Sequence, residues 1–157
     1  MDLEVWELLS YVVTVIGLPL AIIVFVVQQR KERLNEALLV YESLSDSYQM
    51  FLRVALEHPD LHLFSKSKTP VLSPEQTERM MVIFTMLVSL FERAYILIYD
   101  EGASGVQQRH WNSWSDYMRE WCAREDFREV LDTLLTGEDA DFCNYIRKLA
   151  KKRVVGP

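Results

Sequence analysis

The sequence lacks the short motifs by which catalytic and cofactor sites are usually recognised. It has no G-x-S-x-G, no glycine-rich phosphate loop, no H-E-x-x-H and no C-x-x-C. Its two cysteines, Cys122 and Cys143, lack metal-type spacing, and such thiols are most often packing residues. His58 and His62 are four residues apart, but Pro59 disrupts the helical spacing that would align them. We therefore expect no metal and no cofactor.

The sequence also lacks the basic surplus that is typical of nucleic-acid-binding proteins. It has 23 acidic and 17 basic residues in a chain of 157, and its formal net charge is −6. This balance argues against nucleic acid as a partner. Half of the residues are apolar and a quarter are charged, which favours a folded chain over a disordered one. The length allows one domain of ordinary size and an anchor.

No charged residue interrupts the chain from Leu8 to Val27. At about 1.5 Å per residue, a helix of this length matches a hydrocarbon core roughly 30 Å thick. A secretory signal would carry a basic n-region, a shorter apolar core and a small-residue cleavage site. A buried core helix is the other alternative, but a run this long is hard to cover in so small a protein. We predict an N-terminal transmembrane anchor at residues 1–29, in contact with membrane lipid, and a cytoplasmic helical domain at residues 30–157.

Basic residues lie on only one side of the apolar run. Acidic residues precede it, and the basic residues that follow it are Arg30, Lys31 and Arg33. The positive-inside bias predicts an inner-membrane protein with its N-terminus outside and its body in the cytoplasm. The C-terminal "RKLAKKR" is a second basic segment, which either lies against anionic headgroups or is a solvated helix end. The residues assigned to the membrane surface there are Lys148, Lys151, Lys152 and Arg153.

Small residues recur along one face of the predicted span. They are Ser10, Thr14, Gly17 and Ala21. Small side chains allow the backbones of neighbouring spans to approach closely, although some alignment also arises by chance. Pro19 removes a backbone donor, so the carbonyl of Val15 needs another partner inside the bilayer. Both features favour a homo-oligomer in which spans pack together.

The body shows helical periodicity and no convincing strand alternation. No proline or glycine lies between Val27 and His58, so the span is predicted to continue as a long amphipathic helix that ends at "HPDLHLF". "SPEQ" predicts a helix start, with Ser73 as the cap and Gln76 completing a capping box. "MMVIFTMLVSLF" is too short to cross a bilayer and predicts a buried central helix.

The remaining segments complete an all-α prediction. After "YDEGASG" a helix is expected to carry a tryptophan face, which is more often a packing face than a ligand cage. The aromatic and sulfur-containing residues of that face are Trp111, Trp114, Met118 and Trp121. Two short helices follow. The predicted fold is one N-terminal transmembrane helix that continues into a cytoplasmic bundle of about four to five helices.

One spacing suggests catalysis. "RVALEH", from Arg53 to His58, fits the R-x(4–6)-H pattern of HEPN-type ribonucleases, in which a histidine and an arginine act on the RNA backbone. A chain with eleven arginines and three histidines also produces such a match by chance. The alternative is that His58, which precedes a proline, satisfies the last carbonyls of a helix.

The span, "HPDLHLF" and "WNSWSDYMREWCAREDFREVL" together resemble a loose class of small bacterial single-pass membrane proteins with a helical cytoplasmic domain. More distantly, the chain is similar to the membrane accessory protein of type VI-B CRISPR systems, which joins one N-terminal span to a HEPN-like domain and assembles into a ring-shaped pore. This similarity implies that Arg53 and His58 are the motif pair.

The resulting expectation is a non-enzymatic, oligomeric inner-membrane protein that forms a pore or perturbs the membrane, with a role in antiviral (phage) defence. Two alternatives are retained. One is a membrane-tethered HEPN-like ribonuclease. The other is a non-catalytic anchor or accessory subunit that docks onto a protein partner through its tryptophan-rich face.

Overall fold

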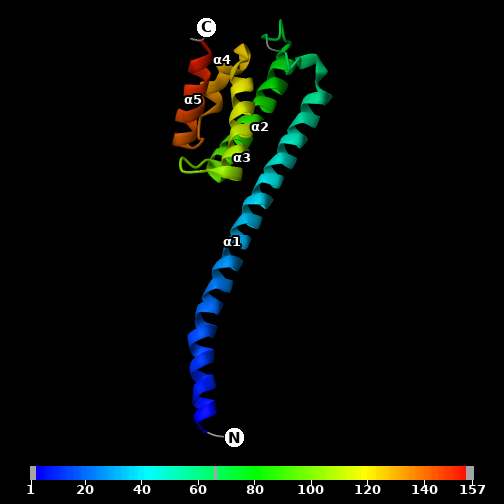
Figure 1. Cartoon of the computed structure of the whole chain (residues 1–157). Coiled ribbons are helices and arrows are strands. Elements are labelled where there is room, and N and C mark those ends of the chain that lie inside the picture. The colour runs from blue at the N-terminus through cyan, green and yellow to red at the C-terminus, as the bar shows by residue number, and fades with distance from the viewer. Residues whose placement is uncertain (1–2, 66, 155–157) are drawn as a thin grey trace. The chain divides into compact units, whose positions relative to one another are not determined.

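A computed structural model describes the backbone of residues 3–65 and 67–154, and the side chains of Trp6, residues 15–65 and residues 67–151. The described residues form five α-helices and one short 3₁₀ helix, and they contain no strand (Figure 1). The elements are α1 (Leu3–Glu57), η1 (Pro59–Leu61), α2 (Pro74–Ile98), α3 (Gly105–Cys122), α4 (Glu125–Leu134) and α5 (Ala140–Val154). The all-α prediction is confirmed.

Helix α1 is continuous and includes Pro19 in its interior. It contributes to two compact units, one that ends at Val40 and one that begins at Tyr41. The second unit thus begins further along the chain than residue 30, where the predicted body began. The side chains from Lys31 to Leu39 are all exposed.

Helix α2 provides much of the core of the second unit. It contacts α3, α4 and α5. Its buried residues are Met80, Ile83, Phe84, Leu87, Val88, Leu90, Phe91, Ala94 and Ile98. The helix begins as predicted, because Ser73 Oγ accepts from the backbone N–H of Gln76 at 3.2 Å and Gln76 Oε1 accepts from that of Ser73 at 2.9 Å. Two orphan donors of the first turn are satisfied in this way.

Among the described residues, α2 is also the one helix that is long and apolar enough to cross a membrane, with a mean hydropathy of 1.9. In its most apolar stretch, 44% of the residues are buried inside the protein. The predicted span at Leu8–Val27 lies partly outside the described residues, because side chains 7–14 are not described. The N-terminal span therefore stays a prediction.

The tryptophan face of α3 packs into the same core. Trp111, Trp114 and Trp121 are each 5% exposed or less. The end of α1 lies against this face, with the rings of Phe51 and Trp121 5.5 Å apart and those of Tyr48 and Trp114 5.7 Å apart, both in edge-on arrangements. The prediction that these tryptophans form a packing face is confirmed.

Candidate functional site

The predicted pair, Arg53 and His58, lies at the C-terminal end of α1. Arg53 is exposed and His58 is half-buried. The arginine beside the histidine is Arg79 of α2, whose Nη1 lies 3.3 Å from Nδ1 of His58. Arg79 also donates to Oδ2 of Asp60 at 3.0 Å, and that oxygen accepts from Nε2 of Gln76 at 3.0 Å. The hydrogen bond from Gln76, together with the charge of Arg79, lowers the pKa of Asp60.

This arrangement attaches the turn after α1 to the first turns of α2. Sequence reasoning missed Arg79 because it lies far from His58 in the chain and shares no motif with it. A histidine that contacts an arginine already paired with a carboxylate is in a structural junction. His58 and Arg79 thus take part in the contact between this turn and α2, and the roles of Arg53 and His58 stay predictions.

A buried ion pair lies where α3 meets α4. Arg124 is 3% exposed, and its Nε and Nη2 donate to the two carboxylate oxygens of Asp126 at 2.6 and 2.7 Å. Nη2 also donates to Oγ1 of Thr69 at 2.6 Å. Nη1 donates to three backbone carbonyls of the loop that follows η1, those of His62, Leu63 and Ser65. We call Arg124, Asp126 and Thr69 the Arg124 cluster.

Side-chain hydrogen bonds from the Arg124 cluster hold the loop between η1 and α2. The loop carbonyls lie outside helices and strands; that of His62 accepts the backbone N–H of Ser65 at 2.9 Å, and an unpaired buried carbonyl is costly. Arg124 satisfies three of them, and the hydroxyl of Thr69 donates to a fourth, the carbonyl of Leu61, at 2.7 Å. The loop is therefore held against the α3–α4 junction by charge-assisted hydrogen bonds.

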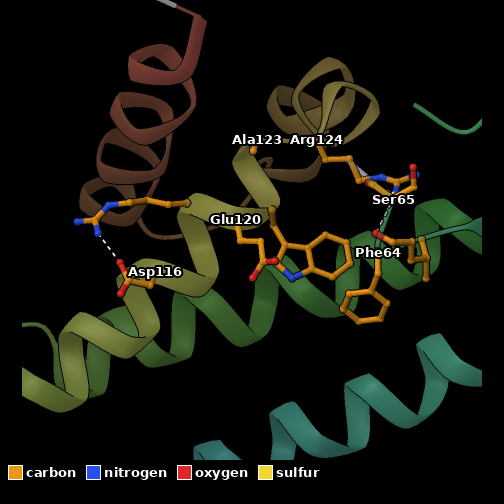
Figure 2. Close-up of a pocket in the computed structure, with 9 residues that line it drawn as sticks. Phe64, Ser65, Asp116, Glu120, Ala123 and Arg124 are labelled. Atoms are coloured by element: carbon orange, nitrogen blue, oxygen red, sulfur yellow. Dashed lines mark hydrogen bonds and ion pairs between the residues drawn. The ribbon is translucent and has the colours of Figure 1, made fainter. Parts of the chain in front are cut away.

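A pocket of about 510 Å³ opens beside this cluster, between the loop and the C-terminal half of α3. Figure 2 shows Phe64 and Ser65 of the loop on one side and Asp116 and Glu120 of α3 on another, with Arg124 reaching toward Ser65. The remaining lining residues are Leu63, Arg119, Trp121 and Ala123.

The lining of this pocket includes an apolar wall and side chains that are already hydrogen-bonded. The rings of Phe64 and Trp121 meet edge-on at 5.7 Å and form an apolar wall. The guanidinium of Arg124 is fully used by its six hydrogen bonds. Ser65 Oγ is hydrogen-bonded to Ser67 Oγ at 2.9 Å, and none of the nine lining residues is a histidine or a cysteine that could activate it.

Two carboxyl groups meet at the end of α4. Glu92 of α2 accepts the backbone N–H of Asp139, and its hydrogen bond with the side chain of Glu138 raises the pKa of Glu138 to about 7. Burial and the negative charge of Glu92 act in the same direction. The hydrogen bond from Asp139 to Glu92 joins α2 to the turn before α5.

Both cysteines are free and buried. Burial raises the pKa of Cys122 to about 12 and also raises the pKa of Cys143. Thiols of this kind are rarely ionised and therefore poorly reactive. Their burial agrees with the prediction that they are packing residues.

The predicted span and surface residues lie mainly on exposed positions of the described chain. Gly17, Pro19 and Ala21 are exposed on α1, whereas the side chains of Ser10 and Thr14 lie outside the described residues. The basic residues with described, exposed side chains are Arg30, Lys31, Arg33, Lys148 and Lys151; the side chains of Lys152 and Arg153 lie outside the described residues.

Comparison with protein-family models, with curated proteins and with solved structures finds no match to this chain.

Proposed function

We propose that this chain is an oligomeric single-pass membrane protein without catalytic activity, whose N-terminal helix anchors it in the inner membrane. One observation carries the proposal. Every large apolar side chain from Val15 to Val27 is between 39% and 67% exposed. A contiguous apolar surface of this extent is rare on soluble monomers and marks a membrane or protein contact.

The charges that follow this segment support the topology. The exposed side chains of Arg30, Lys31 and Arg33 directly follow the apolar stretch. The positive-inside bias then favours a cytoplasmic body. Reporter fusions at the C-terminus test this directly. Activity of a cytoplasmic reporter and silence of a periplasmic one are expected, and the opposite result overturns the orientation.

Self-association is supported by the small residues on the span. Gly17 and Ala21 are exposed on α1 one turn apart, and Pro19 leaves a carbonyl to be satisfied inside the bilayer. Gly17→Leu should obstruct close approach of neighbouring spans and weaken the oligomer. Val26→Leu is the control, because it also places a leucine on the span but on the opposite side of the helix.

The experiment is cross-linking and mass measurement in mild detergent and in native membranes. We expect an oligomer that Gly17→Leu weakens and Val26→Leu leaves intact. A chain that stays monomeric in both media removes the oligomer and leaves the anchor-subunit alternative. An oligomer that persists in a body lacking residues 1–27 moves the interface to the helical domain.

We also propose that the oligomer forms a pore or perturbs the membrane in phage defence. Clustered spans bring several helices together in the bilayer, which is a requirement for a conducting path. Ion flux across vesicles that contain the purified chain tests conduction, and survival of cells challenged with phage tests the role. Flux from the wild type that Gly17→Leu reduces supports the pore, whereas oligomers without flux refute it.

The ribonuclease alternative rests on Arg53 and His58. It requires that His58→Ala abolishes RNA cleavage while the fold stays intact. We expect the wild type to cleave no RNA, because His58 contacts Arg79 in a structural junction. Cleavage by the wild type that His58→Ala removes would establish the enzyme.

A further inference from the structure

A second pocket, of about 680 Å³, lies between the C-terminal end of α2 and helix α5. Three half-buried tyrosines and three acidic residues line it. They are Tyr95, Tyr99, Tyr145, Asp100, Glu101 and Asp141. We call this the tyrosine pocket. It lies entirely within the second unit, away from the proposed anchor in the sequence.

The aromatic walls are held in place by the surrounding core. Tyr95 and Tyr99 are stacked with centroids 4.6 Å apart, and Tyr145 lies 5.4 and 5.7 Å from them. Behind these rings the buried Trp111 lies 4.9 Å from Tyr99 and 5.4 Å from Tyr145. The hydroxyl of Tyr145 is hydrogen-bonded to that of the buried Ser115 at 2.9 Å. The rings are thus ordered without a ligand, which lowers the entropic cost of binding.

The electrostatic environment of the pocket is negative. Asp100, Glu101 and Asp141 are exposed at its rim, and the hydroxyl of Tyr99 donates to Oε1 of Glu101 at 3.4 Å. Burial raises the pKa values of Tyr95 and Tyr99, and the negative charge of Glu101 acts in the same direction on both. Helix α2 ends here without a basic residue in its last turn, so the partial negative charge of its C-terminus is not offset there.

Aromatic faces and carboxylates together select a particular kind of ligand. Carboxylates alone attract any cation, whereas tyrosine faces attract cations through their quadrupole and offer apolar contact to methyl groups. An alkylated ammonium satisfies both because it is charged and weakly hydrated. Lys148 of α5 also lines the pocket, and its positive charge opposes a simple cation but suits a ligand that carries a neighbouring anionic group.

We propose that the tyrosine pocket binds an organic cation of the alkylammonium class, with the methylated nitrogen against the exposed parts of the rings of Tyr95, Tyr99 and Tyr145 and the charge neutralised by Asp100, Glu101 and Asp141. A free quaternary amine and a lipid headgroup share this chemistry.

The first test uses choline, titrated by calorimetry into the full chain in a maltoside detergent, with 3,3-dimethyl-1-butanol as its uncharged isostere. Choline is expected to bind at least tenfold more tightly than the isostere. Equal binding of the two overturns the proposal, because the pocket would then be merely apolar. Absence of choline binding at millimolar concentrations overturns it as well.

Variants locate the binding site. Tyr99→Ala and Glu101→Gln should each weaken choline binding by about two- to fivefold, the size of a partly exposed cation–π or charge contact. Tyr117→Ala is the matched control, because Tyr117 is a partly exposed tyrosine of α3 stacked on Tyr48 at 4.5 Å, outside the pocket. Circular dichroism confirms that each variant is folded. Equal weakening by Tyr99→Ala and Tyr117→Ala refutes the assignment.

Lys148→Met separates the two sources of the cation. The substitution should tighten choline binding by about twofold or more, because it removes a positive charge that repels the choline cation. Glycerophosphocholine carries a phosphate that can pair with Lys148. If a lipid headgroup is the natural ligand, the same substitution should therefore weaken the binding of glycerophosphocholine. Tighter binding of glycerophosphocholine than of choline assigns the lipid, and the reverse order assigns a free amine. No effect of Lys148→Met on either ligand overturns the proposed position.

Discussion

Removing the guanidinium of Arg124 should destabilise the body more than removing any exposed charge. Arg124→Ala leaves the carboxylate of Asp126 without its cation, and the side chain of Asp126 is only 4% exposed. It also removes the donors to three loop carbonyls. Breaking a buried ion pair on one side costs about 3–5 kcal/mol. For a unit of this size that corresponds to a fall in Tm of roughly 10–20 °C.

The assay is thermal unfolding of the full chain in mild detergent, followed by tryptophan emission, since three of the tryptophans lie in the body core. Arg119→Ala is the control, because the pair that Arg119 forms with Asp116 is exposed, with side-chain exposures of 51% and 68%. Exposed pairs contribute roughly 0–1 kcal/mol, so this control should shift Tm by only a few degrees.

A double-mutant cycle isolates the pair itself. Asp126→Ala alone leaves Arg124 buried without its carboxylate, so the double variant should be less destabilised than the sum of the two single variants by more than about 1 kcal/mol. If the Tm of Arg124→Ala lies within about 2 °C of that of Arg119→Ala, the Arg124 cluster does not support the loop. If the effects of the two single substitutions are additive, Arg124 and Asp126 do not stabilise the body as a pair.

Three further outcomes are expected. Because the pKa of Glu138 in the folded chain is about 7, above its ordinary value of 4.5, the folded chain binds this proton more tightly than the unfolded chain. The contribution to stability is therefore greatest below about pH 4.5 and is lost as the pH rises through 7, so Glu138→Gln should flatten the fall of Tm between these values while Glu120→Gln should not. Cys122 and Cys143 should resist alkylation in the native chain and react only in denaturant, as mass measurement will show; rapid native labelling of either contradicts their burial. Ser73→Ala should lower the free energy of unfolding by about 1 kcal/mol through loss of the helix cap, and an unchanged Tm would contradict that role.

Local features of the sequence predicted the helices well, because they depend on residues within one helical turn. The stop before Pro59 follows from the clash of a proline with the preceding helix, and α1 ends at Glu57 as expected. The capping box at Ser73 and Gln76 requires only the backbone of four consecutive residues. The start of α3 at Gly105 follows from the break in "YDEGASG".

The apolar patterns also predicted which faces are buried. The run "MMVIFTMLVSLF" predicted a buried central helix, and seven of its twelve side chains are buried, whereas Val82, Thr85 and Met86 are exposed. The spacing of Trp111, Trp114 and Trp121 places them on one side of α3, so a single neighbouring surface covers all three. The division between the two compact units at Val40 and Tyr41 falls inside a continuous helix, which carries no local mark in the sequence at that point.

Only the tertiary structure decided which charged and aromatic side chains meet. Arg124 and Asp126 look like surface residues in the sequence, and they are buried because the loop from η1 folds over them and its carbonyls need donors. Arg79 reaches His58 across a turn, and Tyr145 joins Tyr95 from a helix distant in the chain. Helical periodicity fixes the face on which a side chain lies, whereas its partner depends on how whole helices pack against one another, which no local pattern specifies.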